Sequence, residues 1–144
     1  MNKNVLFAKA LRTKPLFWSL LTLSQIGMFI TAHEASYLIY RRLYGRTGSS
    51  DLGWGIFIAY FLFVYIVTVI VVGLAGLFFA KGSGFVFALI EWLFLIPFGL
   101  NQLDDFPYKS VLLVIDASIG IFLPWTLCWL VIYLRRKLKP SKTL

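Results

Sequence analysis

The longest apolar run of the chain, WGIFIAYFLFVYIVTVIVVGLAGLFFA (residues 54–80), contains no charged side chain. As a helix this run would be about 40 Å long, whereas the hydrocarbon core of a bilayer is about 30 Å thick. Of the 144 residues, 60% are hydrophobic and only 14% are charged. A soluble chain of this length cannot bury so much apolar surface in its own core. The sequence therefore predicts a membrane protein.

Three further apolar stretches cover residues 15–40, 85–100 and 110–134. The connections between successive stretches are short, which favours helices that lie antiparallel beside one another. A barrel would require alternating polarity, which these stretches lack. We predict an all-α membrane protein, a four-helix transmembrane bundle in antiparallel up-down-up-down order. No connection is long enough for another domain, so residues 1–144 are expected to form a single polytopic membrane domain.

The distribution of basic residues predicts the orientation of this bundle. The side that would carry both termini has Lys3, Lys9, Arg12, Lys14, Lys81, Arg135, Arg136, Lys137, Lys139 and Lys142. The other side has Arg41, Arg42, Arg46 and Lys109. Cytoplasmic segments are enriched in Lys and Arg, so both termini are expected in the cytoplasm. The compact chain and the basic bias at its ends favour the bacterial inner membrane.

The net charge of +8 is explained by these terminal clusters. Basic clusters beside apolar helices attract anionic lipid headgroups. We therefore expect the lipid bilayer, with anionic lipids at the basic termini, as a partner, and no nucleic acid.

Four ionisable side chains fall within the apolar stretches and are the candidate binding residues. They are His33, Glu34, Glu91 and Asp116. An ionised side chain at the bilayer centre costs about 2.5–3.5 kcal/mol on insertion scales, so each needs a partner or a water-filled cavity.

Helix geometry places Glu34 and Asp116 near the same membrane face. Glu34 lies about 28 Å past Pro15, and Asp116 lies about 9 Å past Ser110. One interpretation is that His33 and Glu34 only mark the polar interfacial end of the first segment. The other is that His33 or Glu34 reaches Asp116 across the bundle and forms a polar site open to the outside.

Glu91 lies about 9 Å from the opposite face, so its depth separates it from the other carboxylates. It is either a structural carboxylate, protonated or bonded to a neighbouring helix, or part of a proton or cation pathway.

Small residues at helical spacing predict where the helices approach one another closely. The candidate packing residues are Gly27, Gly73, Gly76, Gly120 and Pro124. On the first segment, two faces at this spacing carry mostly small or polar residues. One face has Thr22, Gln25, Phe29, His33 and Ser36, and the other has Ser24, Gly27, Thr31 and Glu34. The second segment lacks a polar stripe, which favours a helix that faces lipid or a partner.

No phosphate-binding loop, Cys-x-x-Cys pair or nucleophile elbow occurs. One histidine with an adjacent glutamate is too little for a catalytic metal, since neighbouring helical side chains diverge by about 100° and do not converge on one ion. We therefore expect no metal, no cofactor and no catalysis by the chain alone.

The preferred hypothesis is a noncatalytic accessory subunit of a larger membrane complex or a homo-oligomer. The alternatives are a small oligomeric transporter or channel that uses the intramembrane carboxylates, and an immunity-type membrane protein.

Overall fold

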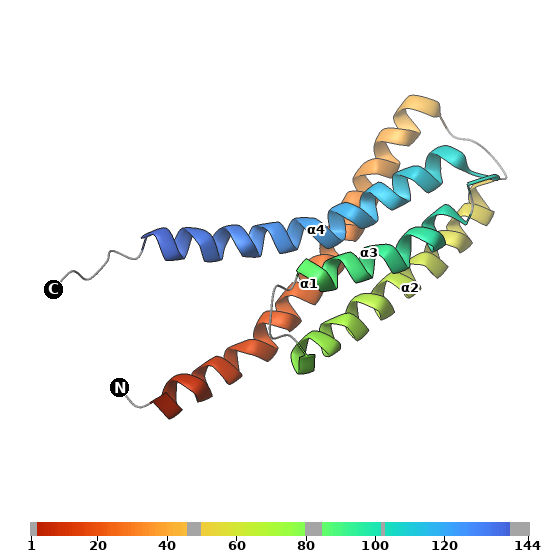
Figure 1. The fold of residues 1–144 in the computed structure, drawn as a ribbon. Coiled ribbons are helices and arrows are strands. Elements are labelled where there is room, and N and C mark those ends of the chain that lie inside the picture. The colour runs from red at the N-terminus through yellow and green to blue at the C-terminus, as the bar shows by residue number, and fades with distance from the viewer. Residues whose placement is uncertain (1–2, 46–49, 80–84, 102, 139–144) are drawn as a thin grey trace.

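The computed structural model describes the backbone of residues 3–45, 50–79, 85–101 and 103–138. These ranges contain four α-helices and no strand. The helices are α1 (Lys3–Tyr44), α2 (Ser50–Phe79), α3 (Phe85–Leu100) and α4 (Pro107–Leu138), as Figure 1 shows. The predicted all-α, four-helix fold is confirmed.

Three of the helices in the described ranges are long and apolar enough to cross a membrane. The candidate spanning segments are Pro15–Tyr44, Gly53–Phe78 and Pro107–Val131. The fourth helix, α3, is apolar but has 16 residues, which corresponds to a length of about 24 Å. These lengths indicate an integral membrane protein.

Three helices extend beyond the apolar stretches of the sequence, and α2 begins at Ser50 rather than at residue 54. Pro15, where the first apolar stretch begins, lies inside α1, which begins at Lys3. The last helix begins at Pro107 rather than at residue 110, because the fixed φ of proline suits the first helical position. At its other end, α1 stops before Gly45, whose φ of 74° is favourable only for glycine and whose N–H donates to the Arg41 carbonyl at 3.1 Å.

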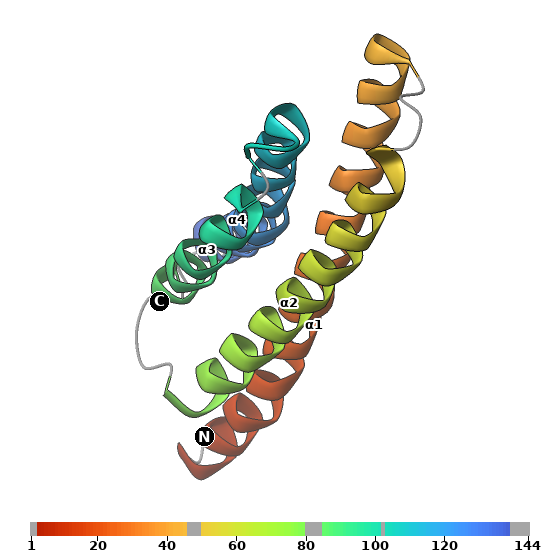
Figure 2. The same ribbon diagram turned by 90° about the vertical axis from the view of Figure 1, so that its right-hand side faces the viewer.

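The helices are arranged as two pairs, α1 with α2 and α3 with α4, as Figure 2 shows. Contacts also join α2 to α3 and α1 to α4, so the four helices form a closed ring. The contact between α1 and α4 is the most extensive of these. The second half of α4 leaves the bundle (Figure 1).

Aromatic side chains fill much of the space between the helices. Phe29 of α1 stacks on Tyr65 of α2 with ring centroids 4.3 Å apart, and Phe61 packs against Phe29 at 5.8 Å. All three are buried, together with Val69 of α2. The second segment therefore packs one face into the bundle, while most of its remaining side chains, Phe63 among them, are exposed and available to lipid or a partner, as expected. Its inward stripe consists of large apolar and aromatic residues rather than small polar ones.

Three of the predicted packing glycines lie where helices approach closely. A Cβ at Gly120 would lie 3.0 Å from the Cα of Phe29, and one at Gly73 would lie 2.7 Å from the Thr22 hydroxyl oxygen. At Gly76 the Trp18 ring occupies the corresponding space. Pro124 is also buried.

Gly27 is different, because it faces outward. No atom lies within 4 Å of the position that its Cβ would take, so this glycine serves no helix contact among the described residues.

We expect Gly120→Leu to lower the free energy of unfolding by about 1–3 kcal/mol, since the added side chain would overlap the Phe29 backbone. The matched control is Gly27→Leu, which should leave stability within about 0.5 kcal/mol of the parent, because its side chain enters open space. Denaturation in mixed detergent micelles measures both values. Equal losses in the two variants would contradict the observed packing.

Candidate functional site

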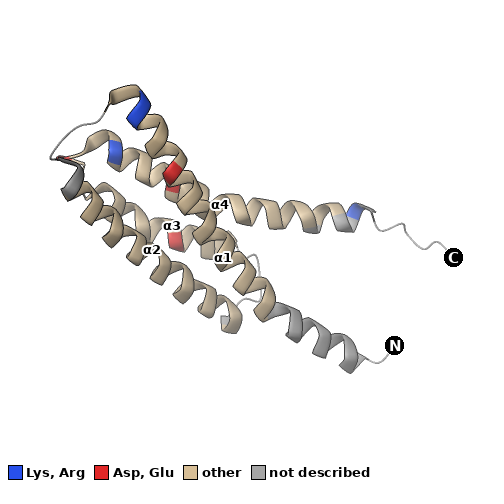
Figure 3. Ribbon diagram, turned by 180° about the vertical axis from the view of Figure 1, so that it is seen from behind, with Lys and Arg blue, Asp and Glu red and all other residues tan. Residues whose placement is uncertain are grey.

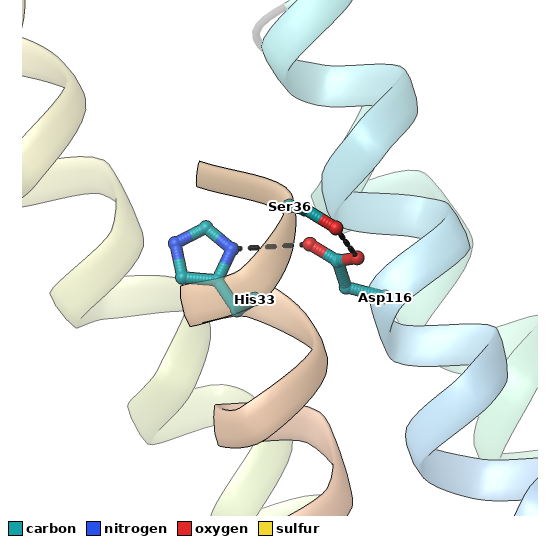
Figure 4. A network of polar contacts seen from close by, with 3 residues as sticks. All are labelled: His33, Ser36 and Asp116. Atoms are coloured by element: carbon teal, nitrogen blue, oxygen red, sulfur yellow. Dashed lines mark hydrogen bonds and ion pairs between the residues drawn. The ribbon is translucent and has the colours of Figure 1, made fainter. Parts of the chain in front are cut away.

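Asp116 is the centre of a polar network between α1 and α4, drawn in Figure 4. Its Oδ2 lies 3.2 Å from the Nδ1 of His33, and its Oδ1 accepts a hydrogen bond of 2.6 Å from the Ser36 hydroxyl. His33 and Ser36 are three residues apart and therefore share one face of α1. Both oxygens of the carboxylate are thus used by one neighbouring helix.

Burial explains why this pairing matters. The Asp116 side chain is 1% exposed, whereas that of His33 is 17% exposed. A carboxylate in this position has little access to solvent and depends on its partners on α1. The network therefore couples the two helices and aligns their register.

A second polar contact joins α1 to α3. The Nε2 of Gln25 donates to the Oε2 of Glu91 over 2.7 Å, and both side chains are buried. Tyr65 of α2 donates its hydroxyl to the backbone carbonyl of Gln25 at 3.1 Å. Glu91 therefore has its own partner and shares none with Asp116, whose carboxylate contacts His33 and Ser36.

One further interhelical bond was not predicted from the sequence. The indole N–H of Trp92 donates to the Ser118 hydroxyl at 2.8 Å, and Ser118 in turn donates to the Val114 carbonyl. Trp92 is adjacent to Glu91, so α3 presents two successive polar groups to different neighbours. In the sequence, the only indication of this contact is that Ser118 is a polar residue within a mostly apolar part of α4.

Glu34, the fourth candidate, does not join the Asp116 network. Its side chain is exposed, and it points away from the face of α1 that carries His33 and Ser36. Of the two residues expected to reach Asp116, His33 makes the contact. Successive residues on a helix point about 100° apart, which is why His33 and Glu34 cannot both face α4.

Lys109 is buried although it lies close to the loop that precedes α4. It lies in the first turn of α4, and its side chain is 7% exposed. Its ammonium lies 5.5–5.7 Å from the ring centres of Tyr40, Trp54 and Phe106. Such cation–π contacts stabilise a charge near a membrane surface.

A small cavity of about 10 Å³ lies between Lys109 and the polar network. Its lining includes His33, Tyr37 and Asp116. This volume accommodates about one water molecule. Across the part of the chain that the structure describes, no group of three His, Cys, Asp or Glu side chains could hold a metal ion.

Comparison with family models, curated proteins and solved structures finds no match to this chain. Its function must therefore be inferred from its own residues.

The Asp116 network predicts energetic coupling between α1 and α4. In a double-mutant cycle of His33→Ala and Asp116→Ala, we expect a coupling energy of about 0.6–2 kcal/mol, the range of interhelical hydrogen bonds in membranes. Unfolding in detergent micelles measures each variant. The matched control pairs Asp116→Ala with Glu34→Ala, whose effects should be additive. Coupling in the control pair as strong as in the first pair would contradict the assignment.

For Glu91, the structure predicts that a hydrogen-bond acceptor matters more than a charge. Glu91→Gln keeps an oxygen for the Gln25 amide and should change the free energy of unfolding by less than about 0.5 kcal/mol. Glu91→Ala leaves the amide of Gln25 unpaired and creates a cavity, so a loss of about 1–3 kcal/mol is expected. Thermal unfolding in one detergent compares the two variants. A loss in Glu91→Gln that matches that of Glu91→Ala would show that the ionised form is required.

Proposed function

We propose that this chain is a noncatalytic accessory subunit that binds a partner membrane protein through the outward face of α1. The single observation that carries this proposal is the exposure of Glu34. His33 and Ser36 flank Glu34 in sequence and contact Asp116, so Glu34 lies at about the depth of Asp116. Asp116 is itself nine residues, or about 14 Å, along α4 from Pro107.

A carboxylate at this depth is unfavourable against lipid hydrocarbon. The other three candidate residues have partners within the chain, His33 and Asp116 in each other and Glu91 in Gln25. For Glu34 a protein helix outside the chain would supply the missing hydrogen-bond donor or cation.

The residues around Glu34 support a helix as the partner. Ser24, Gly27 and Thr31 lie on the same outward face, and all are exposed. The Thr31 hydroxyl donates to the Gly27 carbonyl at 2.8 Å, so this hydroxyl is satisfied within α1. Small residues at this spacing allow close approach of a second transmembrane helix.

A different protein fits this face better than a second copy of the chain. In a symmetric dimer about an axis normal to the membrane, equivalent residues meet at the same depth. Glu34 would then face another Glu34, and like charges repel in a low dielectric. A partner helix with a Lys, Arg or amide side chain at this depth would be complementary.

Transport through the chain has less support. Along α1, Phe29 lies between Gln25 and His33, and its ring is buried against Tyr65. This packing separates Glu91 from Asp116 by an apolar layer, and the cavity beside Asp116 accommodates about one water. Proton or cation passage would require a different arrangement of these helices.

The proposal includes the topology expected from the sequence. In it, all four helices cross the membrane in up-down order, and both termini lie in the cytoplasm of a bacterial cell. Arg41 and Arg42, in the last turn of α1, would then lie at the outer surface together with Lys109. The more numerous basic residues near the termini support this orientation.

We expect purification from native membranes in mild detergent to yield this chain with a stoichiometric membrane-protein partner. Glu34→Leu should reduce that association at least tenfold, which corresponds to about 1.4 kcal/mol, because it removes the complementary charge. Phe63→Leu, a change on the exposed side of α2, is the matched control and should retain the partner. Quantitative mass spectrometry of the purified samples gives the ratio.

Reconstitution tests the transport alternative in the same samples. Liposomes containing the parent chain and a pH- or cation-sensitive dye should show no flux. A flux that Asp116→Asn abolishes would overturn the accessory role and favour a transporter. A partner-free monomer from native membranes would also contradict the proposal.

A further inference from the structure

An apolar groove lies between the last turns of α1 and the first turns of α4. The two helices diverge toward the top of Figure 2, and the groove at this end has a volume of about 530 Å³. Ile39 and Leu43 line it on α1, and Val111 lines it on α4. Tyr44 and Tyr108 lie at the end nearest the helix termini, with ring centres 6.2 Å apart.

We propose that this groove binds one phospholipid molecule from the surrounding membrane. An acyl chain would occupy the apolar length of the groove, and the phosphate would lie at its tyrosine-lined end.

The size and lining of the groove fit an acyl chain. Its volume lies within the range of about 300–1,000 Å³ that is typical of small-molecule sites, and its walls are mostly apolar. Ile39, Leu43 and Val111 are all exposed within the chain, so the groove is open to the lipid phase along its side. A hydrocarbon chain can therefore enter laterally without crossing a polar barrier.

The charges at the groove's end favour a phosphate. Arg42 does not line the groove, but it is exposed in the same last turn of α1 that contributes Leu43 and Tyr44 to the groove. Its long side chain could therefore reach a phosphate held at the tyrosine-lined end. Basic residues occur at this end of both helices, as the positions of α1 and α4 in Figure 3 show. An arginine can bind a phosphate through two parallel hydrogen bonds, and tyrosine hydroxyls can donate further ones.

The inner end of the groove adjoins the polar network. Ser36, Tyr40 and Leu112 line both the groove and the small cavity beside Asp116. A bound acyl chain would therefore cover this cavity from the lipid side. It would shield the hydrogen bond between Ser36 and Asp116, which is one reason why the site should contribute to the stability of the α1–α4 contact.

This site is independent of the proposed partner surface. The groove uses the side of α1 that carries Ser36, Tyr40 and Leu43, whereas the partner surface uses Gly27 and Glu34. Failure of either proposal leaves the other intact, since different variants test each one.

The test is native mass spectrometry of the delipidated chain after titration with dioleoyl phosphatidylglycerol. We expect one tightly retained lipid per chain. Val111→Trp, which fills the groove, should weaken retention about tenfold or more, equivalent to about 1.4 kcal/mol. The matched control is Ile119→Trp, which lies on the same exposed side of α4 but about 12 Å further along the helix, and should retain the lipid as the parent does.

Two further measurements separate the acyl chain from the phosphate. Arg42→Ala should weaken retention of phosphatidylglycerol but not of dioleoylglycerol, which has the same chains and no phosphate. Thermal unfolding should show that Val111→Trp and Ile119→Trp remain folded to the same degree.

Equal lipid retention in the two tryptophan variants would overturn the proposal. So would a dimer of the parent chain that Val111→Trp dissociates, because the groove would then hold a second protein molecule. Equal retention of phosphatidylglycerol by Arg42→Ala and the parent would remove the phosphate from the assignment.

Discussion

A lipid environment offers no hydrogen bonds, and this constraint explains the arrangement of the helices. Backbone groups satisfy it within each helix, but His33, Glu91 and Asp116 must find side-chain partners on other helices. Asp116 binds two groups of α1, and Glu91 binds Gln25 of the same helix. Both contacts use one face of α1, so α1 is the element against which α3 and α4 are positioned.

Aromatic packing fills the space around these polar contacts. Phe29 lies one turn from both Gln25 and His33, and its stacking on Tyr65 joins α1 to α2 between the two polar groups. Tyr65 also donates to the Gln25 carbonyl, so one side chain contributes to both kinds of contact. Gly120 permits this close approach, since any larger residue there would meet Phe29. Polar pairing and aromatic packing therefore depend on the same helix separation.

The two proposed binding surfaces follow from what this packing leaves exposed. On one side of α1, Glu34 is a carboxylate that faces away from the bundle, which supports a protein partner. On another side, α1 and α4 diverge beyond Asp116 and form an apolar groove with tyrosine residues at its end, and the same last turn of α1 carries two arginines. The proposed accessory role and the proposed lipid site would thus use different chemistry on different faces of one helix.

The sequence by itself determined the all-α membrane fold, the four helices and the few polar residues that required partners, because hydrophobicity and helix length suffice for these. It also predicted the face of α1 that carries Gln25, Phe29, His33 and Ser36. Only the tertiary structure decided that His33 rather than Glu34 meets Asp116, that Gln25 meets Glu91, and that Gly27 faces outward. Helical spacing shows which residues share a face, but the rotation of each helix depends on the side chains of its neighbours, which are distant in sequence.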